Sequence, residues 1–365
     1  MTEFRMPSLG ADMAAGTLRE WRKQPGETIR RGDIIAEVET QKGIIEVEIF
    51  IDGVIGKLLL KEDQQVPVGT PMAEILTAAE WEQLKSAEPI VAPVQSARKR
   101  ISPLARKLAE EAGISLEGIS GSGEQGAVIA KDIVLKPATV AAKESAPSVR
   151  AAVAATMERS NKEIPHYYLQ KVIDLSVLTG FLCERNRHVA PEHRILPAAA
   201  WVKATARALK ECPDLNGWWK AGQLQRADST HIGFAISLRG GGLVNPAITD
   251  ADSLSLEETM VRLSGLIDRA RNGKLRSTEF SAGTITVSSI GTDGADTLFG
   301  MIHPPQVALV GIGPIREHVL AVDGMVAIRP AAMVTLAADH RATDGTYGSR
   351  FLRLLAEQLQ HPGKW

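Results

Sequence analysis

The sequence predicts a multidomain protein with a flattened all-β domain first, a small α-helical domain next and an α/β domain last. Three observations carry this prediction. An internal repeat fills residues 1–76, a compact helical pattern lies at 99–135, and strand and helix patterns alternate over 149–365. Two stretches with polar residues, alanine and proline but no sustained apolar period, 77–98 and 136–148, separate these regions and are expected to be linkers.

Composition limits the partners and the compartment. The chain has 365 residues, 44% hydrophobic residues and a net charge of −1, which suits large cores but gives no bulk attraction to nucleic acid or membrane. The first residues lack the apolar run of a signal peptide, and no segment has the length of a membrane span. Cys183 and Cys212, the only cysteines, have neither metal-ligand nor redox spacing. We therefore expect a cytoplasmic protein without a disulfide or a metal site.

Two equal copies of one pattern make up the β domain. A shift of 37 positions aligns Gly16–Val38 with Gly53–Ile75 without a gap. Short alternating runs with glycine at the turns favour antiparallel strands. The residues that join the copies, Glu39-Thr40-Gln41-Lys42-Gly43, would form a hairpin. This arrangement places Lys42 at the tip of a two-fold-symmetric domain, where a lysine is presented to another protein.

Helix signals mark the region 99–135. Ser102 suits an N-cap, Pro103 suits the first helical position, and Gly113 ends an apolar face that begins at Leu104. About 35 residues are very few for an independent core. We therefore expect this region to serve as a docking surface.

The last region alternates strand and helix patterns. Apolar runs predict strands at 231–237, 283–289, 306–311 and 333–338, and helical periodicity predicts helices at 196–209 and 349–359. The final helix has its apolar residues on one face. This pattern predicts an α/β domain of about 215 residues.

The strongest catalytic pattern follows the last predicted strand. An apolar run ends at Asp339, and His340, Arg341 and Asp344 come directly after it. A histidine at a strand end can be aimed into a cleft as a general base, and Asp344 is close enough to fix its ring or a supporting arginine. A structural histidine followed by an aspartate helix cap explains the same residues equally well.

These residues resemble the His-Arg-x-x-Asp-Gly signature of 2-oxo acid dehydrogenase acyltransferases (E2 components) and of chloramphenicol acetyltransferase. Ile164-Pro165-His166-Tyr167, Arg150–Met157 and Pro304-Pro305-Gln306 also match family stretches. The resemblance implies a chloramphenicol-acetyltransferase-like fold, with His340 as the base and Asp344 in its support. It also implies an oxyanion-stabilising hydroxyl at Ser288, with Ser289 as the alternative, supplied by the neighbouring subunit of a trimer.

The two smaller regions resemble other domains of this family. The Lys42 hairpin resembles that of lipoyl domains, which implies lipoate on Lys42; the methionines that flank the lysine of the related biotin carrier are absent. The region 99–135 resembles the peripheral-subunit-binding domain, and Arg106 and Lys107 match its basic docking face. Such a domain holds the thiamine-diphosphate-dependent decarboxylase or the dihydrolipoyl dehydrogenase, and both partners remain open at this stage.

The resemblance covers nearly the whole chain and implies the acyltransferase core of a 2-oxo acid dehydrogenase complex. Lipoyl-Lys42 would deliver an acyl group to coenzyme A; acetyl is preferred, while succinyl and branched acyl groups remain open. Trimers of such proteins form a 24- or 60-subunit core, and the sequence does not separate the two. The rival hypothesis is a non-catalytic, lipoyl-bearing scaffold that docks the dihydrolipoyl dehydrogenase. Such relatives lose the catalytic histidine, whereas His340 is present.

Overall fold

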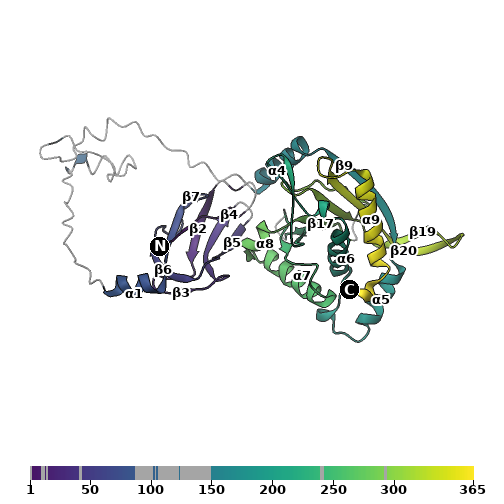
Figure 1. Ribbon diagram of the computed structural model, residues 1–365, viewed down its shortest axis with the longest axis horizontal. Coiled ribbons are helices and arrows are strands. Elements are labelled where there is room, and N and C mark those ends of the chain that lie inside the picture. Colours follow the sequence, from purple (N-terminus) through teal and green to yellow (C-terminus); the bar gives the residue numbers. More distant parts are fainter. Residues whose placement is uncertain are drawn as a thin grey trace. The chain divides into compact units, whose positions relative to one another are not determined.

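The computed structural model describes residues 2–9, 13, 15–40, 43–86, 102, 104–105, 123, 149–238, 242–291 and 294–365. The chain contains an amino-terminal β module and a carboxy-terminal α/β module (Figure 1). Each module has its own hydrophobic core. Lys42, Arg106 and Lys107 lie outside the described residues, as does most of the expected helical domain. No helix in the described part of the chain is long and apolar enough to cross a membrane.

Two antiparallel sheets in the β module repeat one arrangement. The strands are β1 (Thr2–Arg5), β2 (Ala15–Trp21), β3 (Thr28–Ile29), β4 (Ile34–Thr40), β5 (Gly43–Glu48), β6 (Gly53–Leu58), β7 (Gln65–Pro67) and β8 (Pro71–Leu76). One sheet has the order β1-β8-β6-β3, and the other contains β5-β4-β2-β7. In the first copy β2 pairs with β4 and β7, and in the second β6 pairs in the same way with β8 and β3. The predicted repeat is therefore confirmed as two interlocked strand units.

Equivalent residues of the two copies fill the core of the β module. Leu18 and Val38 of the first copy and Ile55 and Ile75 of the second are all buried in one cluster. β4 and β5 pair as far as their last and first residues, which stand on either side of Gln41 and Lys42. Paired strands therefore lead to Lys42 from both directions along the chain.

The stretch expected to be a linker from residue 77 begins with a helix instead. α1 (Ala78–Ser86) follows β8 directly. The N–H of Thr77 donates to Glu80 Oε2 at 2.8 Å, and the N–H of Glu80 donates to Thr77 Oγ1 at 3.3 Å. This reciprocal pair is a capping box, a Thr-x-x-Glu start signal that outweighs the weak apolar periodicity of the segment.

Helices and strands alternate in the α/β module, as predicted. Its helices are α4 (Val149–Glu163), α5 (Ser176–Asn186), α6 (Pro197–Glu211), α7 (Leu256–Arg271), α8 (Ser277–Ser281) and α9 (Gly345–Leu359), with single 3-10 turns η3 (Pro191–His193), η4 (Pro213–Leu215) and η5 (Pro362–Lys364). Its strands are β9 (His166–Asp174), β10 (Gly217–Lys220), β11 (Gln223–Arg226), β12 (Ile232–Phe234), β13 (Ile236–Ser237), β14 (Leu243–Val244), β15 (Ala247–Ile248), β16 (Leu275–Arg276), β17 (Ile285–Ser289), β18 (Ala308–Ile312), β19 (Arg316–Val322) and β20 (Met325–Asp339).

A mixed seven-stranded sheet forms the centre of this module. The order is β15-β12-β17-β18-β20-β19, and β9 also pairs with β20. β12, β17 and β18 run parallel, whereas β20 is antiparallel to β18, β9 and β19. β20 begins at Met325, eight residues before the predicted start, because its first half forms a hairpin with β19. The α/β class is confirmed.

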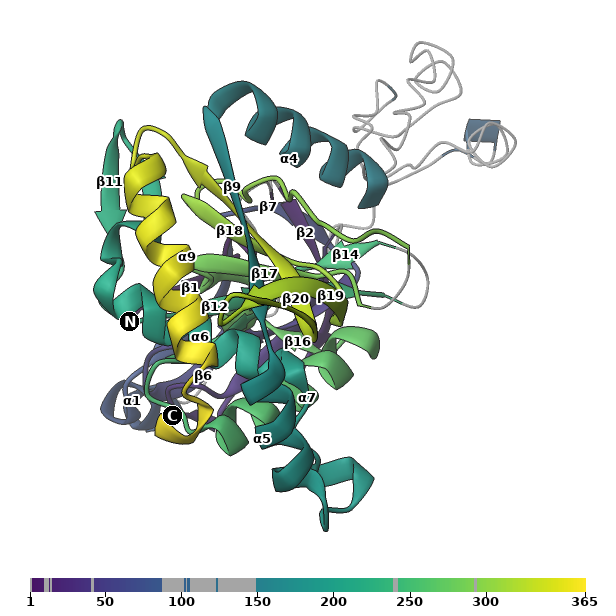
Figure 2. The same cartoon turned by 90° about the vertical axis from the view of Figure 1, so that its right-hand side faces the viewer.

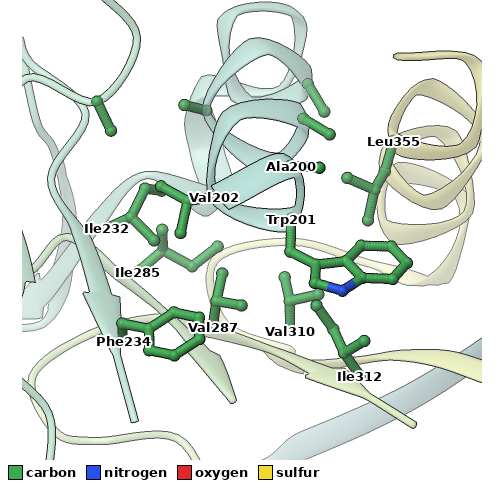
Figure 3. Packing of buried hydrophobic residues seen from close by; sticks show 14 of the residues in the cluster. Ala200, Trp201, Val202, Ile232, Phe234, Ile285, Val287, Val310, Ile312 and Leu355 are labelled. Carbon is green, nitrogen blue, oxygen red and sulfur yellow. The ribbon is translucent and has the colours of Figure 1, made fainter. Parts of the chain in front are cut away.

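One face of this sheet is covered by helices and holds the main core. α6 and α9 pack against each other, and α9 runs beside β9 (Figure 2). Figure 3 shows the buried side chains between the strands and the helices, among them Trp201, Ile285, Val287, Val310 and Leu355. Successive strand residues point to opposite faces. The alternate residues of β17, which include Ser288, therefore lie on the other face.

Candidate active site

β20 delivers His340 to the end of the sheet. The last residue of β20 pairs with the first residue of β9, and the N–H of His340 donates to the Pro165 carbonyl at 2.9 Å. The His340 side chain is exposed, and its ring meets that of Tyr167 edge-on, with 5.2 Å between the centroids. Tyr167 shares a hydrogen bond with Thr343 Oγ1 at 2.9 Å, and burial raises the pKa of the tyrosine. His340 is thus held by its backbone and by one ring contact, while the imidazole stays open to a substrate.

A buried ion pair builds the turn around His340. Asp339 has a fully buried side chain, and Arg341 donates to it from Nε at 2.9 and 3.1 Å and from Nη2 at 2.6 Å. The Arg341 N–H donates to the same carboxylate at 2.9 Å, and the Asp339 carbonyl accepts the N–H groups of Ala342 and Thr343. A buried carboxylate without partners is strongly destabilising, so these donors hold the turn in one conformation. The sequence prediction gave neither flanking residue a role, although an Asp-His-Arg run at a strand end was the available signal.

Asp344 lies at the start of a helix. Its carboxylate accepts the N–H of Tyr347 at 2.9 Å and caps α9. The arginine of the motif binds Asp339 instead. Of the two explanations that the sequence left open, the structure shows the helix cap, because the turn brings Asp344 to the first free N–H groups of α9, where a carboxylate is favoured. A supporting role of Asp344 in catalysis stays a prediction.

A polar pocket of about 550 Å³ opens beside His340. Its lining runs from His340 through Asp344 to the first turn of α9, and Asp214 of η4 closes another side. The N–H of Asp214 donates to the Tyr347 hydroxyl at 3.2 Å, and its carboxylate forms an ion pair with Arg226. The volume suits a small-molecule substrate. Within the described residues no group of histidine, cysteine and carboxylate side chains could hold a metal ion.

Ser288 lies far from His340 within one chain. Ser288 of β17 pairs with Gly311 of β18, which pairs with Thr335 of β20. His340 is five residues beyond Thr335, which is about 16 Å along the strand, and β17 lies two strand spacings, about 10 Å, from β20. The two residues are therefore about 19 Å apart. Ser289 pairs one position farther from His340 and, by alternation, faces the helix-covered side.

Family models match most of the chain. Residues 140–365 match 2-oxoacid dehydrogenases acyltransferase (catalytic domain). Residues 2–75 match Biotin-requiring enzyme, and residues 99–134 match e3 binding domain. These matches follow the order of the three regions in the sequence.

The chain also resembles whole acyltransferases and their solved catalytic parts. It is 28% identical over 402 residues to the dihydrolipoyllysine-residue acetyltransferase component of the pyruvate dehydrogenase complex of Rickettsia felis, covering 98% of this chain and 97% of that protein. A probable dihydrolipoamide acetyltransferase of Listeria monocytogenes superposes with a TM-score of 0.55 and 31% identity, covering 59% of this chain and 92% of the other. The dihydrolipoamide acetyltransferase of Azotobacter vinelandii superposes with a TM-score of 0.54 and 28% sequence identity, covering 57% of this chain and 86% of the other. The catalytic family model covers more than half of the residues of this chain, so the chain belongs to the 2-oxoacid dehydrogenase acyltransferase family.

Proposed function

We propose that this chain is the acyltransferase core of a 2-oxo acid dehydrogenase complex and transfers an acetyl group from lipoyl-Lys42 to coenzyme A. The observation that carries the proposal is the exposed imidazole of His340, fixed at the end of β20 beside a polar pocket. The family matches at 2–75, 99–134 and 140–365 support it, and the names of the relatives favour acetyl over succinyl and branched acyl groups.

Lys42 suits lipoate because β4 and β5 pair up to the residues that flank Gln41 and Lys42. In this proposal, Lys42 presents its amine to a modifying enzyme and then to the partner sites that the arm must visit. The lipoyl group, when attached, supplies the sulfur that carries the acyl group. Attachment through the lysine amine also keeps this sulfur on a long, tethered arm at high effective concentration.

His340 acts as the general base in this proposal. A thiol with a pKa of about 8.5 is mostly protonated at neutral pH, so a neutral imidazole that removes the coenzyme A proton promotes attack on the acyl carbon. Negative charge then develops on the acyl oxygen, and the Ser288 hydroxyl donates a hydrogen bond to it. As the old thioester C–S bond breaks, the His340 imidazolium gives its proton to the departing sulfur, which restores the neutral base. Asp344 contributes by capping α9 and so fixing the end of the His340 turn.

The active site in this proposal forms between two copies of the chain. A separation of about 19 Å prevents one chain from placing Ser288 and His340 on the same carbonyl. In the Azotobacter vinelandii enzyme, the serine, histidine and asparagine studied for their role in catalysis are spaced by 52 and 4 positions. Ser288, His340 and Asp344 have the same two spacings, whereas Ser289 does not. We therefore assign the hydroxyl to Ser288 of a neighbouring subunit in a trimer.

Two partner enzymes complete the proposed complex. The match to the e3 binding domain supports dihydrolipoyl dehydrogenase as the ligand of the region 99–135, with Arg106 and Lys107 as its basic contacts. A thiamine-diphosphate-dependent decarboxylase loads the lipoyl arm. Cys183 and Cys212 are both free, which supports the reducing environment of the cytoplasm.

The test uses the purified full chain with dihydrolipoamide and acetyl-, succinyl- or branched acyl-coenzyme A. We expect the highest kcat/KM with acetyl-coenzyme A, and a loss of about 10²- to 10⁴-fold in His340→Ala, because a general base contributes this much. His188→Ala is the matched control, since His188 is an exposed histidine outside the pocket. An unchanged rate in His340→Ala would overturn the role of His340 as the base, and a wild type without transferase activity would favour the non-catalytic scaffold.

A further inference from the structure

The hairpin of β10 and β11 lies beside the segment that leads into β18. The N–H of Trp219 donates to the Pro305 carbonyl at 2.8 Å, and Trp218 Nε1 donates to the Gly283 carbonyl at 3.1 Å. Two residues after Pro305, the Val307 carbonyl accepts the N–H of Asp339 at 2.9 Å. One short segment thus holds both the hairpin and the end of β20 in register.

Trp219 also contacts the catalytic turn through its ring. The guanidinium carbon of Arg341 lies 4.8 Å from the centroid of the Trp219 ring. The Arg341 side chain is 31% exposed, whereas its partner Asp339 is 0% exposed. Water therefore has access to the arginine but not to the carboxylate. An indole over the guanidinium attracts the cation and shields the ion pair from water on that side.

We infer that Trp219 is a positioning residue for His340. Its ring holds the Arg341 guanidinium on Asp339, and Asp339 in turn fixes the backbone that follows the histidine. Trp219 is not among the residues that line the His340 pocket, so its effect passes through Arg341. This inference rests on the proposed function, because it concerns the orientation of the base in the same reaction.

The same hairpin supplies a matched control. Lys220 Nζ lies 4.7 Å from the centroid of the Trp218 ring, so a second cation–ring pair of similar geometry stands next to the first. The ring partner of Lys220 is Trp218, which lies outside the turn from Asp339 to Asp344, and Lys220 does not line the His340 pocket. Loss of this pair perturbs the hairpin without touching Arg341.

The experiment measures kcat and both KM values of the full chain for Trp219→Ala, Trp219→Phe and Lys220→Met. We expect kcat of Trp219→Ala to fall about 3- to 10-fold, with KM values within about twofold, since a cation–ring contact of this kind is worth that factor. Trp219→Phe keeps a ring face and should retain more than about half of kcat. Lys220→Met should match the wild type.

A coupling measurement separates positioning from a general loss of packing. In an Arg341→Lys background the fork onto Asp339 is already lost, so Trp219→Ala should lower kcat by less than about twofold further. Equal losses in Trp219→Ala and Lys220→Met, or a full additional loss in the Arg341→Lys background, would overturn the inference. An inactive wild type with every acyl-coenzyme A would instead overturn the proposed function.

Discussion

Mixed assemblies of two inactive variants test the intersubunit site directly. One chain carries His340→Ala with intact Ser288, and the other carries Ser288→Ala with intact His340. The sheet register places these residues about 19 Å apart in one chain, so each complete site needs one residue from each of two copies. Neither variant can complete a site with copies of itself.

The expected recovery follows from chance assembly. In a 1:1 mixture each site receives an intact His340 with a probability of one half and an intact Ser288 with a probability of one half. The whole randomly assembled population should therefore show about one quarter of the wild-type activity per chain, and trimers that contain both variants about one third. When each variant is assayed alone, the activity of His340→Ala should fall about 10²- to 10⁴-fold and that of Ser288→Ala about 10²- to 10³-fold. The recovered rate would thus exceed either parent by at least about 25-fold.

The assay follows acyl transfer between acetyl-coenzyme A and dihydrolipoamide after co-expression of the two differently tagged chains and purification through both tags. Selection for both tags enriches mixed assemblies, and parents mixed after purification serve as the unexchanged control. Ser289→Ala alone should retain near-wild-type activity. A co-expressed mixture no faster than the average of its parents would refute the intersubunit site, and a fully active Ser288→Ala chain would refute the choice of serine.

Three further changes test single features of the chain. Lys42→Arg should lack the lipoyl mass increment that intact-mass measurement finds in the wild type from a lipoylation-competent host; an unmodified wild type would contradict the carrier role. Gly311→Ala should lower the free energy of unfolding by about 1–3 kcal/mol, because an added Cβ would lie 2.3 Å from the Leu298 carbonyl oxygen. Gly180→Ala, with open space around it in α5, should instead raise the melting temperature. Similar changes in the melting temperatures of the two glycine variants would disprove the steric argument. Asp344→Ala should lower the free energy of unfolding by about 1 kcal/mol, because it removes the cap of α9. Asp344→Asn should lower it much less, because asparagine also caps helices, and thermal denaturation measures both changes.

Local patterns were sufficient for much of the fold. The 37-residue repeat predicted the paired strand units of the β module, because an equal spacing of glycine and apolar residues in two copies requires equal strands and turns. The helix start at Thr77 is also a local signal, a capping box, but the composition of the residues that follow it predicts a linker. The motif at Asp344 suits both a helix cap and a catalytic support, so the sequence alone does not choose between them.

The sequence by itself predicted which residues would carry the proposed chemistry: a lysine between two copies of a repeat, and a histidine where an apolar strand ends. Only the tertiary structure decided how the histidine is held and which residues surround it. The pairing of β17, β18 and β20 separates Ser288 from His340, and the contact of Trp219 with Arg341 joins residues 122 positions apart. Periodicity records which face of a strand is buried, but the register between distant strands is set by packing of the whole sheet, which no local pattern encodes.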